Sequence, residues 1–152
     1  AEWADEGDEQ QYEPLLAAAE RAEIQTVIPV DAPEFQNPKS MQQAIRGYCE
    51  RQALDVPQTK ADLTRVVLQS LAAKYAEATQ ALNAMLPEPI KKLHIIGGGS
   101  QNKLLNRLTQ QALGIPVEAG PVEATAIGNI LTQALAKGEV ADIHEMRSIA
   151  IV

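Results

Sequence analysis

The sequence predicts an α/β domain in which a short sheet is flanked by helices. Short runs of branched apolar residues alternate with longer segments whose apolar residues recur at helical spacing, and glycine or proline separates them. The chain has 152 residues, enough for one domain with its own core. We therefore expect residues 1–152 to form a single domain.

The chain opens with an acidic segment that leads into a helix. Residues 1–23 carry eight acidic residues and one basic residue, which accounts for the whole net charge of −7. Apolar residues on one face predict a helix from about Glu9 to Ala22, with its start nearer Tyr12 if Pro14 lies in the first turn. The apolar run 26–30 then predicts a strand at a sheet edge or strand end, since its proline lacks an N–H.

Two further helices complete the first half. Ser40 is a candidate N-cap for a helix that buries Ile45 and Cys49, and the preceding loop directs Phe35 into the core. The longest helix is expected over residues 60–85, which would span about 39 Å. Its expected core-facing stripe consists of Leu63, Val67, Leu71, Tyr75, Ala78, Leu82 and Met85.

The most distinctive stretch joins a strand to a helix through three glycines. Leu93–Ile96 predicts a short buried strand, the glycines at 97–99 end it, and a helix follows as far as Leu113. Ser100 lies where the N-cap of that helix would lie. Glycines at a helix N-terminus leave N–H groups free and let a ligand approach the main chain, because no Cβ is in the way.

This stretch favours a nucleotide or another anionic ligand, and the alternative is a tight turn without a ligand. It matches neither the P-loop nor the dinucleotide fingerprint, since no Gly-Lys-Ser or Gly-Lys-Thr follows and the next glycine is Gly114. The amides of Gln101 and Asn102 lie beside the glycines. Each could bond to an adenine edge or a ribose, or cap the helix locally.

A third strand and two helices are expected at the end of the chain. Ile115–Ala119 predicts the strand, and a Gly-Pro turn separates it from a helix that Glu123 opens and Gly138 ends. Gly128 inside this helix indicates a close backbone contact. A short helix is expected from Asp142. The residues of the longer helix expected to face the core are Ile127, Ile130, Leu131, Ala134 and Leu135.

Composition argues against several classes of function. The absence of a basic patch with interleaved aromatic residues argues against nucleic-acid binding, and no apolar run approaches the roughly 20 residues of a membrane span. A single cysteine permits no intrachain disulfide, which suits the cytoplasm, and no signal peptide is visible. His94 and His144 lack metal-ligand spacing, and Glu118 and Glu123 are expected to face water or cap a helix. The residues alone therefore predict one ligand-binding surface, at the glycine stretch, and no complete set of catalytic residues.

Two segments of the second half resemble the C-terminal adenosine motif of sugar kinases of the FGGY family. The first is Gly97-Gly98-Gly99-Ser100-Gln101-Asn102 with the Gly114-Ile115-Pro116-Val117 that follows, and the second is Gly120-Pro121-Val122-Glu123-Ala124-Thr125. Phe35-Gln36-Asn37-Pro38, with Met41 beyond, resembles a Phe-x-Asn-Pro-x-x-Met stretch of the family members that act on L-rhamnulose. Kinases of L-fuculose or D-xylulose, and a non-catalytic α/β interaction module, remain as alternatives.

The resemblance implies a partial actin-like, ribonuclease-H-like ATPase domain that binds ATP with Mg²⁺. By position, Gly98 would contact ATP, Gly97 and Gly99 would shape the turn, and Asn102 would face the adenosine. The family transfers the γ-phosphoryl group of ATP to a sugar hydroxyl with an aspartate as base.

The resemblance also implies what this chain lacks. The family's catalytic aspartate, its first phosphate loop and its sugar-binding residues have no counterpart here. We therefore expect residues 1–152 to be most of the C-terminal, ATP-binding domain, without the N-terminal sugar-binding domain. This chain alone is expected to be inactive, with no catalytic residue and no metal ligand of its own.

Overall fold

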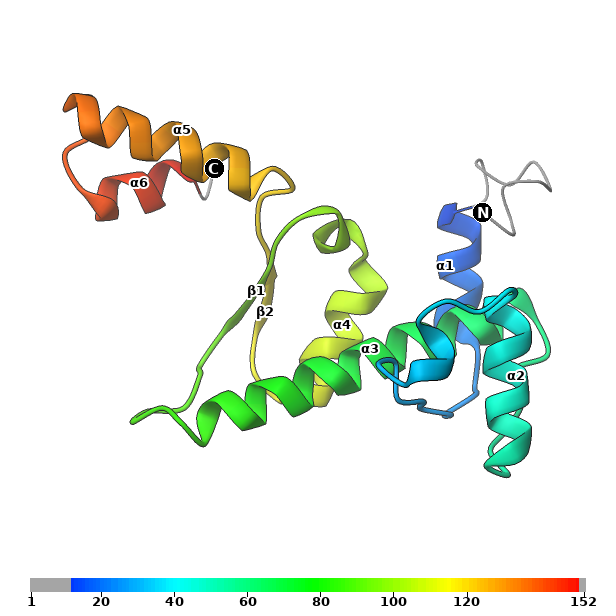
Figure 1. Ribbon diagram of the computed structural model, residues 1–152. Helices are drawn as coiled ribbons and strands as arrows, with labels where there is room; N and C mark the ends of the chain where they lie inside the picture. The colour runs from blue at the N-terminus through cyan, green and yellow to red at the C-terminus, as the bar shows by residue number, and fades with distance from the viewer. Residues whose placement is uncertain (1–11, 151–152) are drawn as a thin grey trace.

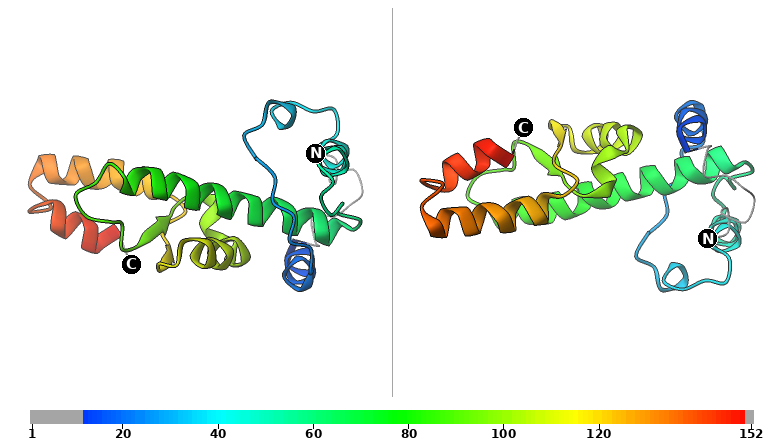
Figure 2. Two further views of the ribbon diagram at one scale, coloured as in Figure 1. Left: turned by 90° about the horizontal axis from the view of Figure 1, so that it is seen from below. Right: turned by 90° about the horizontal axis from the view of Figure 1, so that it is seen from above.

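A computed structural model describes residues 12–150 and shows an α/β arrangement built along one long helix. Helix α3 (Lys60–Asn83) runs through much of the molecule, with α1 (Tyr12–Arg21) and α2 (Met41–Arg51) near its first end (Figure 1 and Figure 2). Beyond its other half lie α5 (Ala124–Lys137) and α6 (Ile143–Ala150), which form a hairpin. The α/β class predicted from the sequence is confirmed. The part of the expected first helix before Tyr12 lies outside the described residues.

The sheet consists of two parallel strands. β1 (Leu93–Ile95) pairs with β2 (Val117–Ala119) in register, residue 93 opposite 117 and residue 95 opposite 119. Helix α4 (Lys103–Leu113) connects them, as parallel neighbours require a crossover. Both strands therefore end at the same edge of the sheet, so the turn after β1 lies beside the turn after β2. Both strands are shorter than the sequence predicts.

The prediction of a strand at residues 26–30 is wrong, because this segment lies irregularly along α3. The N–H of Ile28 donates to Ser70 Oγ over 3.0 Å, and the Gln69 side-chain amide donates to the carbonyl of Thr26. Ser70 in turn donates to the carbonyl of Val66. Ser70 and Gln69 of α3 thus satisfy backbone groups of Ile28 and Thr26 that would pair with a neighbouring strand in a sheet.

Two apolar clusters pack on successive parts of α3. The cluster nearer its start joins α3 to α2 and the preceding loop, and the other joins it to α1 and α4. The predicted stripe is wrong toward the helix end, since Leu82 and Met85 are exposed, Met85 by 82%. The first cluster contains Ile28, Phe35, Ile45, Cys49, Leu63 and Val66. The second contains Ala19, Leu68, Ala72, Leu104, Leu105 and Leu108.

Several local predictions are confirmed. Ser40 caps α2 by accepting from the N–H of Gln43, and Gly114 and Gly138 end α4 and α5 in the left-handed conformation. Cys49 is fully buried, and burial raises the pKa of its thiol, which disfavours the nucleophilic thiolate.

No helix among residues 12–150 has the length and hydrophobicity to cross a bilayer.

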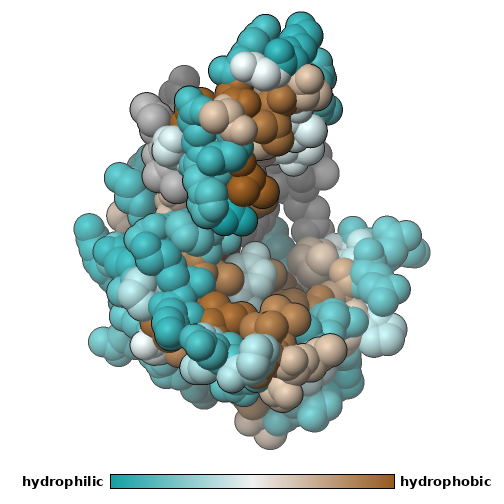
Figure 3. All heavy atoms as spheres, turned by 90° about the vertical axis from the view of Figure 1, so that its left-hand side faces the viewer, coloured by the Kyte–Doolittle hydropathy of each residue, from teal (hydrophilic) through white to brown (hydrophobic). Residues whose placement is uncertain are grey.

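The α5–α6 hairpin stands away from the two apolar clusters. Leu131 is buried on α5, but Ile130 is 66% exposed, and hydrophobic side chains gather on the hairpin and in the hollow below it (Figure 3). The expectation that Ile130 faces the core is therefore wrong. No atom lies within 4 Å of a Cβ built on Gly128, so the predicted close backbone contact is wrong for the described residues.

The buried Ser70 hydroxyl yields a first prediction. In the Ser70→Ala variant, the N–H of Ile28 would stay buried without an acceptor, which costs about 1–3 kcal/mol. We expect the free energy of unfolding, measured by urea denaturation, to fall by that amount. Ser148→Ala, at an exposed hydroxyl on α6, is the matched control and should change it by less than about 0.5 kcal/mol. Equal effects would contradict the role of Ser70.

The start of α3 yields a second prediction, on pH. Thr59 accepts from the N–H of Asp62, and the Asp62 carboxylate accepts from the N–H of Thr59 over 2.9 Å, which forms a capping box. This bond, a hydrogen bond with the Thr59 side chain and a bond from the N–H of Gln58 hold the pKa of Asp62 below its usual value, against the effect of desolvation. The carboxylate therefore stabilises the fold fully above the unfolded pKa of about 3.9, and this stabilisation is lost as pH falls through the folded pKa.

We accordingly expect Asp62→Ala to lower the free energy of unfolding at pH 7 by about 0.3–1 kcal/mol. The difference from the unmodified chain should shrink as the pH is lowered below 4 in urea titrations. Ser40→Ala, which removes the cap of α2, is the control, because no carboxylate takes part in that cap and the effect should persist at low pH. A difference for Asp62→Ala that is as large at pH 3 as at pH 7 would refute the assignment.

Candidate functional site

The three glycines form an open corner between β1 and α4, which we call the glycine corner (residues 97–102). Gly97 has φ 80° and ψ −170°, a conformation that side chains disfavour. A short 3-10 helix, η4 (Gly98–Gln101), follows, and the N–H of Ser100 closes it by donating to the carbonyl of Gly97 over 3.0 Å. The predicted strand, glycine turn and helix are thus present in that order.

The outer side of the glycine corner is free of side chains. Gly98 and Gly99 are exposed, and no atom lies within 4 Å of a Cβ built on any of the three glycines. The N–H groups of Gly98 and Gly99 donate to no acceptor among residues 12–150. The corner therefore offers two unpaired backbone donors to a ligand.

Asn102 lies beneath the corner and takes the N-cap role that the sequence assigned to Ser100. Its Oδ1 accepts from the N–H of Leu105 over 2.9 Å, and its Nδ2 donates to the hydroxyl of Tyr12 over 3.2 Å. The prediction of Ser100 as the cap is wrong, because η4 moves the start of α4 two residues further along. The Asn102 amide thus holds α4 against α1, and the role of Tyr12 had no signal in the sequence.

Ser100 is instead buried under the corner. Its side chain is 2% exposed, and its hydroxyl has no hydrogen-bond partner among the described residues. Its carbonyl accepts from Asn106 Nδ2 over 2.9 Å. The inner side of the corner is therefore tied to α4 through backbone and amide groups, while the outer side stays open.

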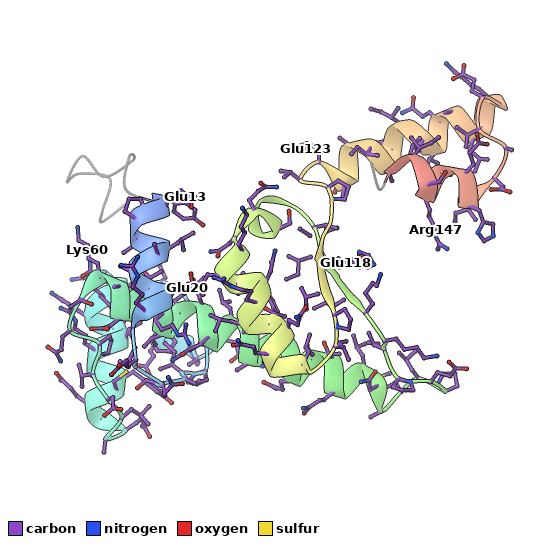
Figure 4. The ribbon with its side chains drawn as sticks, turned by 180° about the vertical axis from the view of Figure 1, so that it is seen from behind. Glu13, Glu20, Lys60, Glu118, Glu123 and Arg147 are labelled. Atoms are coloured by element: carbon purple, nitrogen blue, oxygen red, sulfur yellow. The ribbon has the colours of Figure 1, made fainter. Side chains whose placement is uncertain are left out.

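A groove of about 250 Å³ begins beside the corner, between α1 and α4. Charges of both signs line it, including Glu13 and Glu20 of α1 (Figure 4) and Lys103 of α4. Arg107 on α4 pairs with Glu20 across the groove. The groove adjoins the corner through Gln101, whose side chain is exposed.

The two carboxylates beside the second turn do not form a pair. Glu118 lies on β2 and Glu123 at the start of α5 (Figure 4). Lys92 Nζ lies 2.6 Å from Glu118 Oε1, and this hydrogen bond holds the pKa of Glu118 below its usual range. His94 Nδ1 lies 3.7 Å from the other oxygen, and Glu123 is exposed without a capping bond. Glu118 thus belongs to a cross-strand cluster with Lys92 and His94, and Glu123 stands apart from it. The two carboxylates are not arranged as an acid–base pair.

Within residues 12–150, no three His, Cys, Asp or Glu side chains gather as a metal site. The arrangement can bind a ligand through the backbone donors of the glycine corner. The chemistry that it supports is therefore binding and orientation of a small polar molecule at the glycine corner.

Comparison with known proteins agrees with the resemblance noted in the sequence. Residues 1–137 match the model described as the C-terminal domain of the FGGY family of carbohydrate kinases. A rhamnulokinase of Bacteroides thetaiotaomicron is 45% identical over 139 residues, which cover 91% of this chain and 29% of that protein. Rhamnulokinases of Pectobacterium carotovorum and Bacillus subtilis are 44% and 39% identical over 88% and 91% of the chain.

These matches cover only 27–29% of the length of the three relatives. Measured on this chain, the family match covers residues 1–137, which include the glycine corner and the turn after β2. The chain therefore belongs to the FGGY family of carbohydrate kinases, as a part of their C-terminal domain.

Proposed function

We propose that this chain is the ATP-binding part of a rhamnulokinase, which phosphorylates L-rhamnulose to L-rhamnulose 1-phosphate in rhamnose breakdown. The observation that carries the proposal is the open glycine corner with its two unpaired N–H groups. The names of the relatives support this sugar over L-fuculose or D-xylulose.

In this proposal, ATP lies against the outer side of the glycine corner. Gly98 is the main contact, because its N–H is free and its missing side chain leaves room for the ligand. Gly97 and Gly99 shape the surface on either side. Asn102 completes the site from beneath, where its amide holds the start of α4 in place.

ATP supplies the phosphoryl group that is transferred, and Mg²⁺ accompanies it to offset the phosphate charge. We assign no metal ligand to this chain, since residues 12–150 contain no cluster that could hold the ion. This chain's residues bind and orient the nucleotide through backbone donors, and we place neither the catalytic base nor the sugar site among them.

We further infer that residues 1–152 form most of a C-terminal domain with an actin-like, ribonuclease-H-like fold. The catalytic base and the sugar site then belong to an N-terminal domain of the parent enzyme, which we place in the cytoplasm. The 27–29% coverage of the relatives supports this division. No ATP-dependent phosphorylation of L-rhamnulose is expected from this chain alone in a coupled assay for ADP, and turnover would refute the division.

Gly98→Ala tests the site itself. A methyl group at this position meets no atom of the protein, so the fold should tolerate it. It would project into the space that we assign to ATP, and overpacking of a contact costs about 1–3 kcal/mol. We expect roughly tenfold weaker ATP binding, followed by the amide signals of residues 97–102 in an NMR titration, with an unchanged thermal midpoint.

Gly128→Ala is the matched control, because its added methyl group also meets no atom and it lies within α5. It should bind ATP as the unmodified chain does and unfold at a slightly higher temperature, since alanine favours a helix interior by about 0.5–1 kcal/mol. Unweakened binding by Gly98→Ala would refute the contact at Gly98. If the amide signals of residues 97–102 in the unmodified chain do not shift at saturating ATP, the nucleotide site is refuted and a non-catalytic interaction module is favoured.

A further inference from the structure

The turn after β2 is bonded directly to the glycine corner. The N–H of Gly120 donates to the carbonyl of Ile95 over 2.8 Å, which extends the pairing of the two strands by one bond. The N–H of Gly97 donates to the carbonyl of Pro121 over 3.2 Å. Two segments more than twenty residues apart in the sequence are thus joined at the residue that opens the corner.

Gly120 lies closer to its neighbour than a side chain would allow. A Cβ built on Gly120 would lie 2.8 Å from Ile96 Cγ2 and 3.5 Å from the Ile95 carbonyl oxygen. The second distance is an ordinary contact, so the clash is with one methyl group. That methyl group is attached directly to the Cβ of a β-branched residue, whose χ1 rotation is restricted. Relief of the clash would therefore move Ile96 or the turn.

A movement of Ile96 would be passed to the residues that follow it. Gly97 is bonded on one side to Pro121 and on the other to Ser100, whose N–H donates to the Gly97 carbonyl. The left-handed φ of Gly97 sets the direction in which the N–H groups of Gly98 and Gly99 point. The turn after β2 thus braces the first peptide units of the corner against β1.

We propose that Gly120 is a positioning residue for the nucleotide site, because its lack of a side chain lets the Pro121 carbonyl hold Gly97 in the orientation that ATP binding requires. The inference rests on the proposed function of the glycine corner. It extends the site from one turn to two, with Gly120 and Pro121 acting through Gly97 and not touching the ligand themselves.

Substitutions at Gly120 and Ile96 test the proposal in the 152-residue chain. Dissociation constants for ATP would be measured by titration calorimetry, with the Gly97 amide signal and the thermal midpoint recorded without nucleotide. We expect Gly120→Ala to shift the Gly97 amide signal and to weaken ATP binding at least about tenfold, since small misplacements of binding groups have large effects. The thermal midpoint should change little, since Gly120 has no left-handed φ and alanine can adopt its conformation.

Removal of the clashing methyl group should rescue the defect. The double variant Gly120→Ala with Ile96→Ala lacks the atom at 2.8 Å, and we expect it to bind ATP within about twofold of the unmodified chain. Ile96→Ala alone is the control, since Ile96 is 58% exposed and its truncation should change neither binding nor folding appreciably. If Gly120→Ala does not fold, the double variant decides: binding like the unmodified chain supports the proposal, and weak binding overturns it.

The outcomes separate this inference from the function on which it rests. If the unmodified chain binds ATP and Gly120→Ala binds it equally well, the positioning role is overturned and the nucleotide site stands. If Gly120→Ala is weakened and the double variant is not rescued, the mechanism through Ile96 is overturned. If the unmodified chain shows no heat of binding and no shift at Gly97, both the proposed function and the inference fall.

Discussion

The packing of two apolar clusters along α3 is the constraint on which the rest of the structure depends. Residues in the first half of this helix hold α2 and the irregular segment around Ile28, and those from Leu68 onward hold α1 and α4. Since α4 precedes β2 and follows β1, its contact with α3 also determines where the parallel pair lies. The position of the glycine corner thus follows from a helix that contributes no residue to it.

The corner combines rigidity beneath with an open surface above. Asn102 caps α4 and donates to the hydroxyl of Tyr12 on α1, so α1, α4 and the glycine corner meet at this residue. Above it, the absence of side chains leaves two backbone donors exposed. Binding through the main chain requires both a fixed inner side and an open outer side. The direction of a backbone N–H is set only when the peptide units around it are held in place. Parallel pairing adds a second support by bringing the turn after β2 against Gly97.

Much of the local structure could be predicted from the sequence. Gly114 and Gly138 end helices because glycine adopts the left-handed conformation without a steric penalty, and Ser40 caps α2 because its hydroxyl reaches the first turn. These signals act over three or four residues and depend little on distant contacts. The strand–glycine–helix order of the site was predictable for the same reason, and so was burial of Cys49. The conformation of the segment 26–30 was not predictable, since a short apolar run fits a strand, and only Ser70 and Gln69 of α3 decide where its backbone groups bond.

The sequence by itself therefore determined the α/β class, most helix ends and the glycine stretch, all of which depend on spacing and local conformational preference. Only the tertiary structure decided that Asn102 rather than Ser100 caps α4, that Tyr12 supports it, and that α5 packs against α6 with Ile130 exposed. It also decided that Gly120 and Pro121 brace Gly97. The physical reason is that the bonds from Asn102 to Tyr12 and from the turn after β2 to Ile95 and Gly97 join residues far apart in the chain. Their distances arise from helix packing on α3 and from the register of two parallel strands, which no local pattern records.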